Sequence, residues 1–85
     1  MVYGQVPDWG VWQPVLNTSW PRRPSYVIPR DPIPVRVRIV WAHDGETLVD
    51  GRAIGWLGRH VRVELDDPRL GPLSTWVNAA DVTRR

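Results

Sequence analysis

The 85-residue sequence contains no cysteine, no phenylalanine and no lysine. The absence of cysteine excludes disulfide bridges, thiolate zinc ligands and cysteine nucleophiles. No apolar run approaches the ~20 residues that a membrane-spanning helix needs, and the first residues lack the pattern of a secretory signal. We therefore expect a protein without membrane association, located in the cytoplasm, or in a virion if a phage encodes it.

All eleven basic residues are arginines, and the formal net charge is only +2. Residues 1–38 hold five arginines and two aspartates, whereas residues 39–85 hold six arginines and seven acidic residues. The basic character therefore belongs to the front of the chain, although the total charge is too small to indicate a nucleic-acid binder by itself. The abundance of arginine and tryptophan is typical of a GC-rich genome and fits an actinobacterial protein or one from a phage of such a host.

Residues 1–33 read as an extended N-terminal arm. Seven of the nine prolines lie in residues 1–34, and proline at this spacing prevents a long helix or a central strand. The arm is too rich in tryptophan, tyrosine and aliphatic side chains for a solvated disordered tail. We expect it to dock on an apolar surface, either on its own barrel or on a neighbouring subunit.

Residues 34–85 read as short strands joined by turns. Alternating apolar side chains in "PVRVRIVW" predict a strand with one buried face. The two Asp-Gly pairs at 44–45 and 50–51 predict tight turns, further strands follow at 52–57, 60–66 and 74–77, and Asn78 suits the cap of a single helical turn. This pattern predicts one all-β domain, a small barrel of about five strands.

The runs "VRIVWAHDGETLVDGRAIGW", "VRVELDD" and "TWVNAADV" together resemble the SH3-like and Tudor-like small-barrel superfamily. "GRAIGWL" and "STWVNAAD" also look like two segments of the type II dihydrofolate reductases, which are short SH3-like barrels. The resemblance would place Trp76 at their active-site Tyr position. Ser74 and Thr75, however, replace the Gln-Ile pair that contacts cofactor and substrate there, so the resemblance implies a shared fold without the chemistry.

No set of residues forms a catalytic, cofactor-binding or metal-ligating motif. His43 and His60 lack carboxylates at a ligand spacing, and Asp44, Glu46 and Asp50 do not match a calcium loop. The serines lack a nucleophile elbow, and there is no glycine-rich phosphate loop. We expect a non-enzymatic protein without a cofactor or metal.

The strand at 51–57 has apolar residues on both faces under simple alternation, because Ile54 and Trp56 would point away from Ala53 and Leu57. This pattern favours an apolar outer surface on which the arm's tryptophans lie. Tryptophan and arginine are also common anchors of protein interfaces. We therefore predict a binding or assembly module that contacts protein through Trp9, Trp12, Trp20, Tyr26, Ile54 and Trp56.

Two alternatives remain open. Aromatic and cationic residues interleave in the arm and continue along the first strand, as in proteins that stack bases on rings. A nucleic-acid-binding accessory protein would use Arg22, Arg23, Arg30, Arg36 and Arg38. The remote alternative is a reductase-like enzyme of the type II dihydrofolate reductase class.

Overall fold

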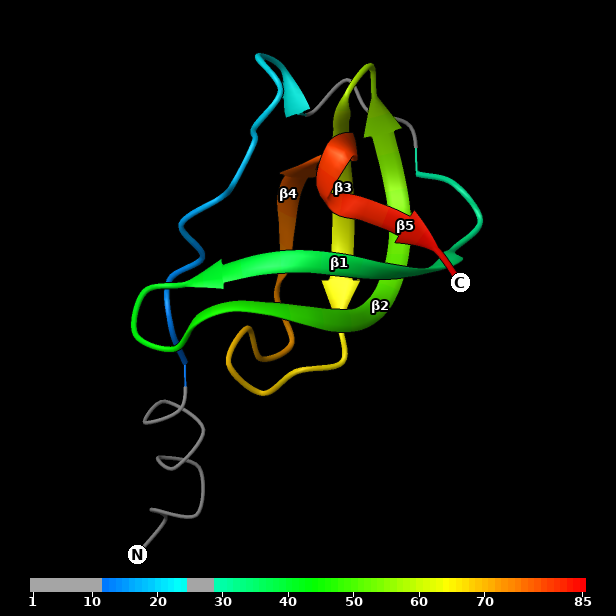
Figure 1. The fold of residues 1–85 in the computed structure, drawn as a ribbon. Helices are drawn as coiled ribbons and strands as arrows, with labels where there is room; N and C mark the ends of the chain where they lie inside the picture. Colours follow the sequence, from blue (N-terminus) through cyan, green and yellow to red (C-terminus); the bar gives the residue numbers. More distant parts are fainter. Residues whose placement is uncertain (1–11, 25–28) are drawn as a thin grey trace, which may run out of the picture.

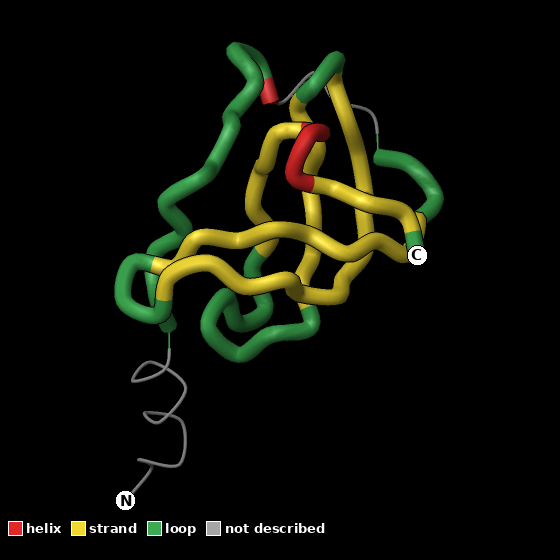
Figure 2. The backbone as a smooth tube through the Cα atoms, in the orientation of Figure 1, coloured by secondary structure: helices red, strands yellow, loops and turns green. Residues whose placement is uncertain are grey.

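The computed structural model describes residues 12–24 and 29–85. Five antiparallel strands form one sheet in the order β4-β3-β2-β1-β5, which confirms the prediction of an all-β domain with about five strands. The 3-10 turn η3 lies between the last two strands (Figures 1 and 2). The elements are β1 (Ile33–Trp41), β2 (Gly45–Leu57), β3 (His60–Leu65), β4 (Ser74–Asn78), η3 (Ala79–Asp81) and β5 (Val82–Arg84).

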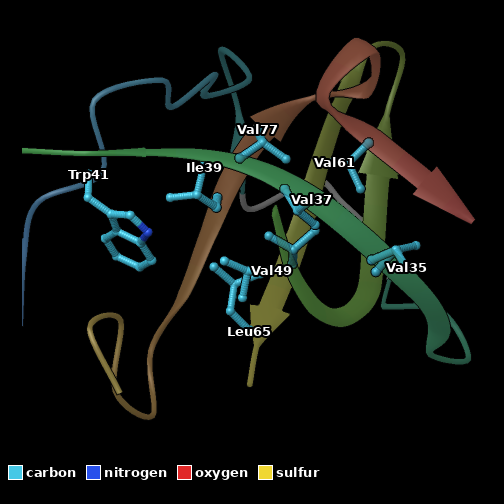
Figure 3. Packing of buried hydrophobic residues seen from close by; sticks show 10 residues of the cluster. Val35, Val37, Ile39, Trp41, Val49, Val61, Leu65 and Val77 are labelled. Carbon is cyan, nitrogen blue, oxygen red and sulfur yellow. The ribbon is translucent and has the colours of Figure 1, made fainter. Parts of the chain in front are cut away.

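The sheet curls because β2 is long and bends, so that its first part pairs with β1 and its second part with β3 (Figure 1). The concave face collects the inward side chains of the alternating strands, with Trp41 at one end of the cluster and Val35 at the other (Figure 3). This arrangement is compatible with a small β-barrel. The core cluster on this face comprises Val35, Val37, Ile39, Trp41, Val49, Ala53, Val61, Val63, Leu65 and Val77.

The two Asp-Gly pairs behave differently. Gly45 has a φ of 74° and ends the turn between β1 and β2, as predicted. The turn predicted at 50–51 is wrong, because Gly51 lies inside β2 and pairs with Leu65. A Cβ at Gly51 would collide with the backbone carbonyl of Glu64. This glycine therefore permits close approach of two strands instead of a reversal of the chain.

A β-bulge changes the alternation at the end of β2. Ala53 pairs with Val63, but the next paired residue is Gly55, opposite Arg62, so Ile54 is the extra residue. Trp56 consequently pairs with Val61, whose side chain points into the core. The prediction that Ile54 and Trp56 share an apolar outer face is therefore wrong for Trp56, which packs against the core instead.

The described arm segment covers two strand edges that would otherwise be unpaired. β5 pairs only with Val35 to Val37 of β1, so β5 leaves the rest of that edge to another partner. The Leu16 N–H donates to the Val40 carbonyl at 2.7 Å, and the Ser19 N–H donates to the Trp76 carbonyl in β4 at 2.8 Å. Residues 15–18 thus join β1 to β4, as the blue segment beside these strands shows in Figure 1. In this stretch the arm docks on its own barrel.

Asn17 supplies the side chain that fixes the arm on β1. Its Oδ1 accepts the Val40 N–H at 2.9 Å, and its Nδ2 donates to the Arg38 carbonyl at 2.9 Å. The side-chain amide thus pairs with the strand edge as a backbone amide would. Nδ2 also donates to a carboxylate oxygen of Asp81 at 3.2 Å, which connects the arm to η3.

We predict that Asn17→Ala lowers the free energy of unfolding by about 1 to 3 kcal/mol, because partly buried backbone groups lose their partners. Urea denaturation measures this change. Thr18→Ala is the matched control, since Thr18 is exposed and contributes to the docking through its backbone. Equal stability of the two variants would contradict the role assigned to the Asn17 amide.

Candidate functional site

Trp20 is the most exposed tryptophan of the described chain, with 58% of its surface accessible. Its ring lies 6.5 Å from that of Trp76, at an interplanar angle of 48°. Trp76 is only 3% exposed although it pairs with the outward-facing Arg62. The arm therefore buries an outer-face tryptophan of β4 and presents a second tryptophan to solvent. The buried Pro21 and the Ser19–Trp76 hydrogen bond hold the backbone on both sides of Trp20.

Trp12 lies on the loop between β3 and β4. Its indole packs on Gly71, where a Cβ would come within 2.5 Å of the indole nitrogen. Gly71 also has a φ of 68°, so this position favours glycine for two reasons. Trp12, Leu70 and Leu73 line a shallow apolar groove of about 280 Å³.

Trp56 contacts a different part of the arm. The guanidinium carbon of Arg30 lies 4.5 Å from the centroid of the Trp56 ring, a cation–π geometry. The Arg30 N–H donates to the Ile54 carbonyl at 3.0 Å. In the described chain, Arg30 is the arm residue that lies on the Trp56 ring.

The structure therefore separates the predicted protein-binding residues. Trp12 contacts the β3–β4 loop, Trp20 contacts β4, and Ile54 and Trp56 lie near Arg30. Trp9 and Tyr26 lie outside the described residues. Sequence reasoning missed the contribution of Trp76. Its signal is that Trp76 and Val77 are adjacent apolar residues, which a strand directs to opposite faces, and the structure buries both.

The predicted basic strip is partly neutralised within the protein. Arg36 Nε lies 2.9 Å from an oxygen of Asp50, and Arg38 pairs with Glu46 at 3.0 Å and with Asp81 at 3.2 Å. These carboxylates raise the pKa of both arginines. Among the predicted residues of the strip, Arg22 and Arg23 are exposed and Arg30 rests on Trp56.

An ion-pair cluster around Arg69 lies next to the Trp12 region of the arm. Arg69 forms a bond of 2.8 Å to Asp67 and one of 3.2 Å to Asp44, and its guanidinium lies 4.5 Å from the centroid of Trp41. The Arg69 carbonyl accepts the Gln13 N–H at 2.9 Å. Hydrogen bonds from Arg69 lower the pKa of Asp67 and outweigh the opposing effect of its partial burial.

The residues of the reductase resemblance have structural contacts. The Ser74 hydroxyl accepts a hydrogen bond from Arg62 Nε at 2.9 Å, and Thr75 is buried opposite Val63.

Within 12–24 and 29–85, histidine and carboxylate side chains form no group of three that could hold a metal ion. No helix in these ranges is long and apolar enough to cross a membrane. No protein-family model, curated protein or solved structure gives a significant match to the chain.

We predict that Asp67→Asn destabilises the protein at neutral pH. Because the folded-state pKa of Asp67 is depressed, its stabilising contribution is present above the ordinary Asp value of about 3.9 and is lost as pH falls through the depressed folded value. The difference from wild type in urea denaturation should therefore shrink toward strongly acidic pH. Asp31→Asn, at an exposed position, is the control, and a difference that stays constant with pH would contradict the assignment.

Proposed function

We propose that this chain is a non-enzymatic protein-binding or assembly module on an SH3-like barrel, and that Trp20 is its principal contact residue. The observation that carries this proposal is a tryptophan that is 58% exposed, although its ring lies beside Trp76 and the preceding residue is hydrogen-bonded to β4. Tryptophan is the residue type that contributes most often to the binding energy of protein interfaces. A fixed ring also loses little conformational entropy when a partner covers it.

The curled five-stranded sheet and the late 3-10 turn support the SH3-like assignment. The turn η3 leads directly into β5, which pairs with β1 at the edge of the sheet. Asn78 Oδ1 accepts the Ala80 N–H at 2.9 Å and caps this turn. The order of hairpins followed by one short turn and a final strand is the pattern from which the resemblance arose.

The nucleic-acid alternative receives less support. Arg36 and Arg38, which would extend the basic strip along β1, are already paired with carboxylates. A phosphate would have to displace these partners. If nucleic acid were the partner, binding to DNA would fall steeply as salt concentration rises.

We predict that the protein self-associates or binds a protein partner through Trp20. Trp20→Ala should weaken that association at least 30-fold, about 2 kcal/mol for the loss of an aromatic anchor. Size-exclusion chromatography with light scattering over a wide concentration range tests self-association. If the wild type is monomeric, affinity capture from cells that express it tests whether a second protein binds through Trp20. The Trp20→Ala variant is captured in parallel for comparison.

Leu48→Ala is the matched control for this experiment. Leu48 is an apolar residue of β2 with 68% exposure, and it lies outside the Trp20–Trp76 contact. Its substitution should leave association unchanged. A monomeric protein with no Trp20-dependent partner would contradict the proposal, and turnover in a cofactor-oxidation assay would favour the reductase-like alternative.

A further inference from the structure

An apolar groove of about 230 Å³ opens on the concave side of the sheet between β2, β3 and β5. Its wall includes Ile33, Ala53, Trp56, Val61, Val82 and Arg84. The bulge at Ile54 places Trp56 on this side, opposite Val61. The pairing of β5 with β1 places Val82 opposite Val37 and Arg84 opposite Val35, so both β5 side chains share the inward face of β1.

The groove is open because β5 pairs only with β1 and leaves the second side of its backbone without a strand. Its volume is below the ~300 to 1,000 Å³ of ordinary small-molecule pockets. The space therefore suits one apolar side chain rather than a larger ligand.

One arginine lines this apolar groove, and a second lies on a tryptophan of its wall. Arg84 lines the groove, and the guanidinium of Arg30 lies on Trp56. Within residues 12–24 and 29–85, neither guanidinium has a carboxylate within 4.0 Å, whereas five other arginines there are paired with Asp or Glu. No acidic residue lines the groove either, as far as the described chain extends.

A second concave surface differs from the groove because it contains both basic and acidic residues. The broad depression of about 570 Å³ beside β1 and β2 is lined by Arg36 and Arg85 together with three aspartates. Asp50 pairs there with both Arg36 and Arg85, at 2.9 and 3.3 Å. Both arginines of that depression are thus paired with a carboxylate, while the positive charge at the Trp56 groove is left for a ligand to neutralise.

We propose that the Trp56 groove binds the C-terminal residue of a partner chain that ends in an apolar amino acid. The side chain fills the groove, and the terminal carboxylate pairs with Arg84 and Arg30. A terminus fits this small groove better than an internal acidic residue, because the nearest acidic side chain on the same face of an extended peptide lies two residues away from the apolar one. Only at the C-terminus do the carboxylate and the apolar side chain belong to the same residue. Arginine is suited to this task because its guanidinium can bind a carboxylate through two parallel hydrogen bonds.

The test is a titration of the intact protein with an acetylated Gly-Ser-Gly-Leu peptide that has a free C-terminus, followed by ¹⁵N–¹H NMR. The expected result is a saturable shift of the Trp56 indole N–H, assigned with a Trp56→Phe variant. The C-terminal amide of the same peptide, and an acid ending in Ser, should each bind about tenfold more weakly or not at all, because each loses one half of the recognition.

Variants of the groove give the second arm of the test. Arg84→Gln should weaken binding about tenfold, and Ala79→Phe, at an exposed position of the groove wall, should block it. Arg59→Gln is the matched control, because Arg59 is an exposed arginine of the β2–β3 turn that does not line the groove.

Three results would overturn the proposal: equal binding of acid and amide peptides, equal weakening by Arg84→Gln and Arg59→Gln, or no indole shift with any peptide. Trp20→Ala should leave the peptide titration unchanged. The outcome is therefore independent of the association proposed for Trp20.

Discussion

The fold depends on satisfying two strand edges, one on β1 beyond its three-residue pairing with β5 and one on β4. Exposed edges offer unpaired backbone groups to other chains. The arm covers both edges with backbone hydrogen bonds, and Asn17 adds a side-chain amide on β1. Pro14 is compatible with this role because only its carbonyl is used, as acceptor of the Ala42 N–H. The prolines of the arm also reduce the conformational entropy that docking must overcome.

The bulge at Ile54 is the second constraint, and it determines where the apolar residues of β2 point. Without it, strict alternation would direct Trp56 away from the core and toward solvent. With it, Trp56 faces Val61 and forms the wall of a groove, while its ring remains accessible to Arg30. The bulge thus explains why apolar residues occupy alternate and adjacent positions at the end of β2. One extra residue moves the tryptophan to the inner face.

Much of the sheet could be predicted from sequence because its signals are local. Period-two alternation identified β1 and β3, and the turn at Gly45 and the cap at Asn78 follow from residue-specific backbone preferences. Gly51 was misread because close approach to Glu64 is a property of the neighbouring strand, which the Asp-Gly pair does not reveal. The bulge was missed for the same reason, since a register shift is defined only by the residues on the partner strand.

The candidate surfaces were harder to predict, because they depend on which arm residue meets which strand. The arm's aromatic content indicated docking, but the partners of Trp12 and Trp20 are Gly71 and Trp76, residues more than 50 positions away along the chain. No periodicity encodes such a pairing. The signal that was available is the adjacent apolar pair Trp76 and Val77, because neighbouring residues of a strand point to opposite faces and both faces then need cover.

The two proposed surfaces rest on different strands and on different physics. Trp20 is supported by β4 and offers mainly apolar contact area, so association through it should depend little on ionic strength. The groove at Trp56 is lined by residues of β1, β2, β3 and β5. Its two arginines have no carboxylate partner among residues 12–24 and 29–85, so binding there should weaken as salt screens the guanidinium groups. The arm supports one surface through Trp20 and contributes Arg30 to the other, so both surfaces depend on the docking of arm residues on the barrel. A partner that bound both surfaces would therefore bind only while the arm is docked. Displacement of the arm would remove the contacts made by Trp20 and Arg30 together.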